Sequence, residues 1–252
     1  MSGHSKWAGI KHKKAIQDAK KGRIFTKIIR EITVAAREGG GNPDTNPRLR
    51  TAIDRAKDVN MPMDNIEKAI KRGTGELPGI TYESCIFEGY GVGGVALLVE
   101  TLTDNKNRTS AEIRNIFSKK GGNLAGVGSV AWIFQKKGYI FIDKNQISED
   151  ELYSIAIEAG AEDIKVGDKN YEVFCSPKDF ETLKEVLTKK GIKWEIAELS
   201  MVPNSTVKLT GSQAKQLLSL IEALEEHDDV QKVYANFDIP DEELEEMAKE
   251  LS

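Results

Sequence analysis

Residues 138–201 read GYIFIDKNQISEDELYSIAIEAGAEDIKVGDKNYEVFCSPKDFETLKEVLTKKGIKWEIAELSM, and this stretch decides the fold class. Two segments carry helix-start signals, the capping box Ser148–Glu151 and the pair Ser176-Pro177, and each is followed by a glycine stop, Gly160 or Gly191. Four segments rich in β-branched and aromatic residues alternate with these helices, at 139–142, 164–166, 171–174 and 194–200. The resulting order, β-α-β-β-α-β, is that of a ferredoxin-like split β-α-β domain.

The segments on either side of this stretch supply a second set of strands and helices. Before it, we predict strands at 84–90, 95–101 and 129–134 and a helix that opens at the capping box Thr109–Glu112. After it, we predict a strand at 206–209, a helix at 212–226 and a strand at 230–237. Joined, these elements form a second ferredoxin-like domain that holds the first as an insertion. The predicted boundaries are 79–136 plus 203–240 for the discontinuous domain, 137–202 for the inserted domain and 241–252 for an acidic tail.

The beginning of the chain has the pattern of a small helical domain, predicted over residues 1–78. A long basic helix ends at the glycine-rich break 39–41, and Asn46 then provides an N-cap for a second helix with Pro47 in its first turn. Met61-Pro62 restarts the chain into a third helix, with Gly73 as its expected stop. The predicted fold class is therefore α+β multidomain, with an N-terminal three-helix domain and two ferredoxin-like β-α-β-β-α-β domains, one inserted in the other.

Charge is distributed very unevenly along the chain. The net charge of the 252 residues is only −4, which by itself argues against a nucleic-acid partner. Residues 1–75, however, hold 17 basic and 8 acidic residues, a net charge of +9, and this leaves −13 for the remainder. A cationic region joined to an anionic body is typical of proteins that bind polyanions through one part only.

The long basic helix concentrates this positive charge on one side. At 100° per residue, an apolar arc that includes Ile28, Ile32 and Ala35 lies opposite an arc that holds Arg23, Lys27, Arg30 and Arg37. A solvated helix face is the alternative interpretation, but such a face usually mixes charges of both signs. The nearly uniform basic arc favours a face that binds a polyanion.

Two further features have competing interpretations. The loop 104–109 consists of turn-forming residues and caps a helix, but its Lys106 and Arg108 also lie where a phosphate can bind, beside a helix N-terminus. Trp7 follows Lys6 in a polar context, where the indole either stacks on a base or anchors the N-terminal arm.

Motifs for enzymatic, metal and cofactor chemistry are weak. Residues 89–94 match G-x-G-x-x-G as a string but lead into a strand-like segment, which predicts a hairpin turn and not a dinucleotide site. The few histidines have no cysteine near them, so we expect no metal, no cofactor and no catalytic triad. Two widely separated cysteines and the lack of a long apolar segment predict a reduced, cytoplasmic protein that does not enter a membrane.

Several short motifs resemble those of the YebC/PmpR family of transcriptional and translational regulators, which includes the mitochondrial translational activator of cytochrome oxidase subunit I. These motifs are Gly3-His4-Ser5-Lys6-Trp7, Ile10-Lys11-His12-Lys13-Lys14, Asn46-Pro47-Arg48-Leu49-Arg50, Asn60-Met61-Pro62 and Asp104-Asn105-Lys106-Asn107-Arg108-Thr109. The resemblance implies three domains, one helical and two ferredoxin-like, and a non-enzymatic role in gene expression. It implies either a DNA-binding transcriptional regulator or a ribosome-associated translation factor that relieves stalling at proline-rich sequences.

We therefore predict a non-enzymatic, nucleic-acid-binding regulator of gene expression in the cytoplasm. DNA and ribosomal RNA both stay open as its partner, and no small-molecule substrate is expected. An enzyme, such as a hydrolase with a site between the helical and α/β domains, and a small-ligand sensor are the alternatives from other classes. The predicted nucleic-acid-binding residues are Lys6, Trp7, Lys11, His12, Lys13, Lys14, Lys20, Arg23, Lys27, Arg30, Arg48, Arg50, Lys106 and Arg108.

Overall fold

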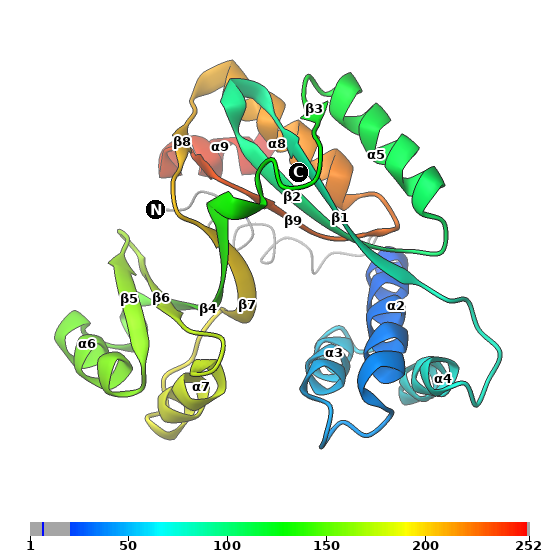
Figure 1. The fold of residues 1–252 in the computed structure, drawn as a ribbon. Coiled ribbons are helices and arrows are strands. Elements are labelled where there is room, and N and C mark those ends of the chain that lie inside the picture. The colour runs from blue at the N-terminus through cyan, green and yellow to red at the C-terminus, as the bar shows by residue number, and fades with distance from the viewer. Residues whose placement is uncertain (1–6, 8–20, 251–252) are drawn as a thin grey trace. The chain divides into compact units, whose positions relative to one another are not determined.

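The computed structural model describes Trp7 and residues 21–250 (Figure 1). These residues belong to two compact units. One contains 130–211 and 234–250 together with Trp7, and the other contains 21–129 and 212–233. Along the described residues, no helix has the length and apolar character that crossing a membrane requires.

The described part of the second unit begins with three helices, as the sequence predicts. They are α2 (Lys21–Gly39), α3 (Pro47–Asp58) and α4 (Met63–Thr74). Their apolar faces form one core, in which Ile32, Leu49 and Ile66 are almost completely buried. The apolar arc predicted for the first helix is therefore a core face, and the arc with Arg23, Lys27 and Arg30 lies on the other side of α2.

The predicted N-cap at Asn46 is confirmed, and it also ties two helices together. Its Oδ1 accepts the backbone N–H of Leu49 at 3.1 Å, while its Nδ2 donates to the carbonyl oxygens of Ala35 and Gly40, each at 2.8 Å. The side chain therefore joins the C-terminal part of α2 to the first turn of α3. Because the residue is 5% exposed, water does not replace these bonds if they are lost.

Replacing Asn46 with Asp tests this junction, because Asp keeps the capping acceptor and removes both donors. The new carboxylate would face two carbonyl oxygens in a buried site, so we expect the free energy of unfolding to fall by about 2 kcal/mol. Urea unfolding followed by circular dichroism measures it. Asn42→Asp is the matched control, since the exposed Asn42 acts only as an acceptor, for the N–H of Asp44. Equal effects of the two substitutions would contradict the proposed junction.

The predicted stop at Gly73 is wrong by two residues. Helix α4 continues to Thr74, and Gly75, with φ of 84°, takes the left-handed position that ends it. Gly73 lies inside the helix, where a Cβ atom would come within 2.4 Å of the Thr33 carbonyl oxygen on α2. This glycine is therefore required by close helix packing and not by helix termination.

The same unit continues with a four-stranded sheet in the order β3-β1-β2-β9. Its strands are β1 (Glu83–Tyr90), β2 (Ala96–Thr103), β3 (Asn123–Leu124) and β9 (Val230–Ala235), of which β9 ends in the other unit. Strands β1 and β2 form the expected antiparallel hairpin, so the glycine string at 89–94 is a turn and not a nucleotide-binding loop. Helices α5 (Lys106–Lys119) and α8 (Gly211–Glu225) pack on one face, where Gly89 and Gly91 approach Phe117 and Leu217 (Figure 1).

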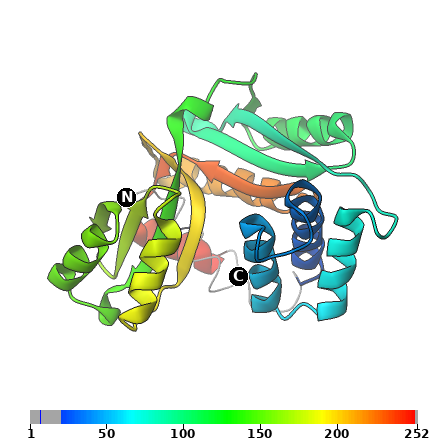
Figure 2. The ribbon, with the colours of Figure 1, turned by 60° about the horizontal axis from the view of Figure 1, so that its bottom comes forward.

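The inserted domain has the β-α-β-β-α-β order that residues 138–201 predict. Its elements are β4 (Phe134–Asp143), α6 (Glu149–Glu158), β5 (Ala161–Val166), β6 (Asn170–Cys175), α7 (Phe180–Lys189) and β7 (Ile196–Pro203). The strands form a sheet in the order β5-β6-β4-β7. Both helices cover the same face, because Leu152 and Leu183 join Ile140 and Val173 in one core (Figure 2). The α+β class is thus confirmed.

The discontinuous part differs from the prediction in two strands. Residues 129–133 form a turn and a short 3₁₀ helix (Ala131–Ile133) instead of a strand, because Phe134 already begins β4 and pairs with Pro203. The strand expected at 206–209 is the short β8 (Val207–Lys208), which pairs in parallel with β10 (Phe237–Asp238) in a separate sheet. Helix α9 (Asp241–Glu250) follows.

The two four-stranded sheets nevertheless share one plan. In each, the outer strands flank a central antiparallel pair, and the order β3-β1-β2-β9 corresponds position by position to β5-β6-β4-β7. The difference lies in the chain order, since β1 comes before β2 whereas its counterpart β6 comes after β4. The discontinuous sheet is therefore a permuted version of the inserted one, and not the simple repeat that the sequence suggested.

Candidate nucleic-acid interface

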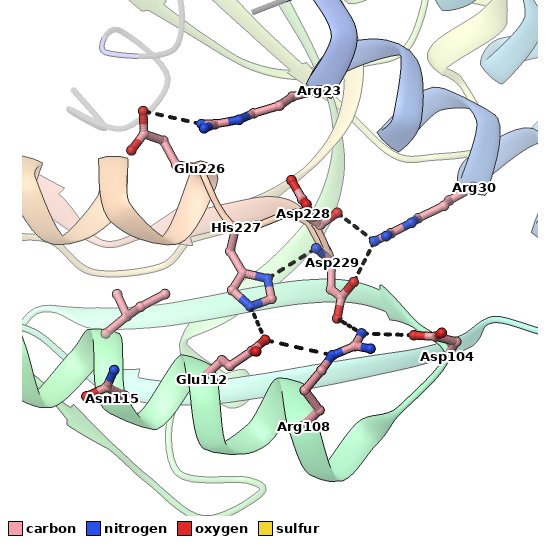
Figure 3. A pocket seen from close by; sticks show the side chains of 11 residues that line it. Arg23, Arg30, Asp104, Arg108, Glu112, Asn115, Glu226, His227, Asp228 and Asp229 are labelled. Carbon is pink, nitrogen blue, oxygen red and sulfur yellow. Dashed lines mark hydrogen bonds and ion pairs between the residues drawn. The ribbon is translucent and has the colours of Figure 1, made fainter.

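Helix α2 places three cationic side chains in a row, and we call Arg23, Lys27 and Arg30 the cation row. Their spacing of four and three residues puts them on one face of the helix. Facing them is the acidic turn, residues 225–229, which begins at the last residue of α8 and contains four carboxylates and His227. Figure 3 shows this region, where Arg23 points toward Glu226 and Arg30 points toward Asp228 and Asp229.

Asp229 is the centre of the contact. Its side chain is 3% exposed, and its Oδ1 accepts Arg30 NH1 at 2.6 Å. Its Oδ2 accepts Arg108 NH2 at 2.7 Å and the Thr109 hydroxyl at 2.6 Å. Arg30, whose side chain is 14% exposed, also donates to the Asp228 carbonyl oxygen at 2.7 Å. One buried carboxylate thus holds two guanidinium groups from different helices.

The rest of the cation row makes looser contacts with the same turn. Lys27 Nζ donates to the Glu225 carbonyl oxygen at 2.6 Å, which places a positive charge at the C-terminal end of α8. Arg23 and Glu226 lie 3.7 Å apart, and both side chains are more than half exposed. The ion pair of Arg30 is therefore short and buried, whereas that of Arg23 is long and exposed to solvent.

Three pKa shifts reflect this electrostatic arrangement. Burial raises the pKa of Asp229, but hydrogen bonds from Thr109, Arg108 and Arg30 outweigh it and lower the pKa to about 2. Burial also lowers the pKa of Lys27 to about 8, although Glu225 and Asp228 favour its charged form. The hydrogen bonds to Asp229 and Asp104 in turn raise the pKa of Arg108. At neutral pH Asp229 is fully ionised.

The lowered pKa of Asp229 predicts a loss of stability in acid. Its folded pKa of about 2 lies below the ordinary 3.8, so the stabilisation is complete above about pH 4 and is lost as pH falls through about 2. The shift corresponds to about 2 kcal/mol. Urea unfolding of wild type and Asp229→Asn at several pH values measures it. The difference in free energy between the two proteins should shrink by that amount on acidification, and a constant difference would contradict the assignment.

A pocket of about 630 Å³ lies beside this contact, within the same unit. It is lined by Arg23, Arg30, Asp104, Arg108, Glu112, Asn115, Ile116, Glu226, His227, Asp228 and Asp229. This is the cleft with convergent ionisable groups that the enzyme alternative requires. Whether it can support catalysis depends on the state of each of these groups.

The groups in the pocket neutralise one another. The backbone N–H of Asp229 donates to His227 Nδ1 at 3.1 Å, which leaves the ring proton on Nε2, 2.8 Å from Glu112 Oε2. Both ring nitrogens are thus engaged, and the strongly acidic Asp229 is a poor base. No serine or cysteine is among the described residues that line the pocket. The geometry does not provide an activated nucleophile or a poised base.

The same three residues, Glu112, His227 and Asp229, also lie close enough to one another to suggest a metal site. Each of their ligand atoms already has a hydrogen-bond partner. A guanidinium group lies against each oxygen of Asp229 and would repel a cation. The cluster is better explained as an ion-pair network than as a metal centre.

The predicted binding residues have different fates in the structure. Six lie outside the described residues: Lys6, Lys11, His12, Lys13, Lys14 and Lys20. Trp7 is described and is 1% exposed, which agrees with the anchoring role and leaves no ring face for a base. Arg48 forms ion pairs with Glu31 and Glu38, whereas Arg50 and Lys106 are exposed.

Arg30 and Arg108, which the sequence predicts as phosphate contacts, have a partner within the protein. Both guanidinium groups bind Asp229. The predicted opening of a helix at the capping box Thr109–Glu112 is wrong, because α5 already begins at Lys106, with Asn105 as its N-cap accepting the backbone N–H of Arg108. Sequence reasoning missed the acidic turn as the partner of Arg30 and Arg108. Its four acids among five residues are visible in the sequence, but they resemble an ordinary solvated segment.

Comparisons with known proteins agree on one family. Residues 5–76 match the family described as TACO1/YebC protein N-terminal domain, and residues 82–237 match TACO1/YebC second and third domain. A probable transcriptional regulatory protein of Dictyoglomus turgidum is 58% identical over 249 residues, which cover 98% of this chain and 100% of that protein. A protein of the same name from Halothermothrix orenii is 55% identical over 253 residues, 99% of this chain and 100% of its own.

A solved structure is similar over most of its length as well. The crystal structure of a conserved hypothetical protein from Aquifex aeolicus is 49% identical and gives a TM-score of 0.79, covering 89% of this chain and 93% of that chain. The solved structure shows that this fold is shared, and the family models and the relatives give the assignment. The resemblance inferred from the short motifs is confirmed, and this chain belongs to the TACO1/YebC family.

Proposed function

We propose that this protein is a non-enzymatic regulator of gene expression that binds a nucleic acid through its basic N-terminal region. The observation that carries the proposal is the separation of charge, +9 in residues 1–75 and −13 in the remainder. Cations gathered in one region provide phosphate contacts, and an anionic remainder limits the contact to that region. The name of its curated relatives, probable transcriptional regulatory protein, supports the same class of function.

The contacts proposed for the nucleic acid change once the ion pairs are considered. Arg30 and Arg108 bind Asp229, so they contribute little to an external partner in this arrangement. The proposed primary contacts are the lysines of the N-terminal arm, Lys6, Lys11, Lys13, Lys14 and Lys20. Arg50 and Lys106 support them, because both are exposed cations.

DNA is the partner that the relatives' name favours, and ribosomal RNA is the second candidate. One observation favours the latter. Cations spread along an arm suit contacts to phosphates, which carry no sequence choice.

The test is the salt dependence of binding to labelled duplex DNA and to labelled RNA, measured by fluorescence anisotropy. If about six cations engage phosphates, the plot of log K against log salt should have a slope of about −4 to −5. Lys11→Gln/Lys13→Gln/Lys14→Gln should reduce the size of the slope by about 2 to 3. The control variant Lys178→Gln/Lys189→Gln/Lys193→Gln removes the same charge from the acidic body and should leave the slope unchanged. A flat salt response of the wild type would overturn the proposal.

Sedimentation of a native lysate on a sucrose gradient separates the two partners. Co-migration with the large ribosomal subunit or the whole ribosome, lost at high salt, would favour the translational role. Migration at the top of the gradient together with tight binding to duplex DNA would favour the transcriptional role. We place either activity in the cytoplasm, which the two free cysteines, Cys85 and Cys175, support because they are unpaired thiols.

A further inference from the structure

Each cation of the row has a partner in the acidic turn. Arg23 faces the Glu226 carboxylate, Lys27 binds the Glu225 backbone carbonyl, and Arg30 binds the Asp228 backbone carbonyl and the Asp229 carboxylate. The partners lie about 200 positions apart in the sequence, so these contacts are a property of the folded chain and not of local structure. The carboxylates of Glu225 and Asp228 also favour the charged form of Lys27, and the phosphates of a nucleic-acid strand would offer the same cations a comparable set of negative charges.

We propose that the acidic turn is an internal competitor of the nucleic acid, which covers the cation row of α2 and is displaced from Arg23 and Lys27 when a phosphate backbone binds. This inference rests on the proposed function. The turn thereby limits binding in the free protein and makes Arg23 and Lys27 available only to a sufficiently dense polyanion.

The contact is built in a way that allows partial opening. The bond between Arg30 and Asp229 is buried and supported by Arg108 and Thr109, so it acts as a fixed anchor. The pair of Arg23 and Glu226, in contrast, is exposed and 3.7 Å apart, and pairs of this kind are weak and screened by salt.

Lys27 lies on α2 between Arg30 and Arg23, and its surroundings partly disfavour its charged form. Its charge is partly removed from water, and its own helix neighbours Arg23 and Arg30 disfavour that charge while Glu225 and Asp228 favour it. Release of the turn would return the ammonium group to solvent or to a phosphate, where its charged form is better stabilised. A phosphate strand therefore gains two cations at the exposed end while the anchor at Arg30 stays closed.

The test compares two variants that have the same net charge. The release variant, Glu225→Gln/Glu226→Gln/Asp228→Asn, removes the three other negative charges of the turn, keeps Asp229, and leaves the backbone carbonyls that Lys27 and Arg30 contact. The control variant, Glu67→Gln/Glu76→Gln/Glu83→Gln, neutralises three exposed acids elsewhere in the same unit. Binding of labelled RNA and duplex DNA is measured by anisotropy from about 50 to about 300 mM salt. Circular dichroism melting confirms that each variant is folded, and Glu226→Gln alone replaces the release variant if that one is not.

The release variant is expected to bind about three- to tenfold more tightly than the wild type at low salt. Its slope of log K against log salt should be steeper by about 1 to 2, because each additional phosphate contact adds about 0.9. The control variant should gain less affinity and keep the wild-type slope. Addition of Arg23→Gln should remove about one unit of slope from the release variant and almost none from the wild type, where Glu226 already neutralises Arg23.

The outcomes separate this inference from the proposed function. If the release and control variants have the same slope and affinity while the wild type binds with a steep salt dependence, the internal competition is overturned and the proposed function stands. If no variant binds either probe in a salt-dependent manner, the proposed function itself is overturned. A steeper slope in the release variant that Arg23→Gln reverses supports both.

Discussion

Replacement of Asp229 with alanine is expected to lower the free energy of unfolding by about 3 to 5 kcal/mol. The side chain is 3% exposed and accepts hydrogen bonds from Arg30, Arg108 and Thr109. Its removal leaves two guanidinium groups facing each other without the carboxylate between them. The cost comes mainly from these uncompensated charges and not from the lost volume. Urea unfolding followed by circular dichroism provides the measurement.

Asp228→Ala is the matched control for this prediction. Asp228 is the neighbouring acid, its side chain is exposed, and its contact with Arg30 is made by the backbone carbonyl, which alanine retains. We expect a change of about 1 kcal/mol or less, as is usual for an exposed charge. Arg30→Met combined with Asp229→Ala should recover part of the loss, because one of the unpaired charges is then absent. A similar loss for Asp228→Ala and Asp229→Ala would show that Asp229 is not the centre of the network.

The second large effect is expected at Gly73, where alanine should destabilise the protein by about 1 to 3 kcal/mol. The added Cβ would lie 2.4 Å from the Thr33 carbonyl oxygen and 2.7 Å from Ala36 Cβ, so α2 and α4 would have to move apart. The prediction is informative because helix propensity alone would have the opposite effect. A change from Gly to Ala inside a helix would by itself raise the free energy of unfolding by up to about 1 kcal/mol. Thermal and urea unfolding distinguish the two directions.

Gly22 offers the control, since it is also a helical glycine and a Cβ there would have no neighbour within 4 Å. Gly22→Ala should leave stability unchanged or raise it by up to about 1 kcal/mol. If Gly73→Ala proved stabilising as well, the two helices would not pack as closely as the structure indicates.

Helices with their own start signals were predictable from the sequence. Asn46 caps α3 through its side chain, and Ser148 lies at the N-cap position of α6 although its side chain makes no capping hydrogen bond. The start predicted at Ser176-Pro177 is three residues early, because Asp179 is the N-cap of α7. Caps and periodic apolar residues act over a few positions only. The strands of the inserted sheet were predictable for the same reason, since they alternate with helices without interruption between Phe134 and Pro203. Local chemistry is sufficient where neighbours in sequence are also neighbours in the fold.

Errors arose where distant parts of the chain decide the structure. Residues 129–133 have the apolar composition of a strand, yet the sheet that accepts a strand here begins its pairing at Phe134. Gly73 resembles a helix stop, but Thr33 on another helix is the reason for the glycine. In both cases the local pattern fits two structures equally well, and packing selects between them.

The sequence by itself determined the helices and strands of most of the chain, its family, and the separation of charge between residues 1–75 and the remainder. Only the tertiary structure decided which cations face the protein itself. A basic row on a helix has the same periodicity whether its partner is a phosphate or a carboxylate. Arg30 and Asp229 meet across almost 200 positions because the sheet and α8 bring the acidic turn to α2. The pattern of the sequence specifies that a charge row exists, and the folded chain specifies what covers it.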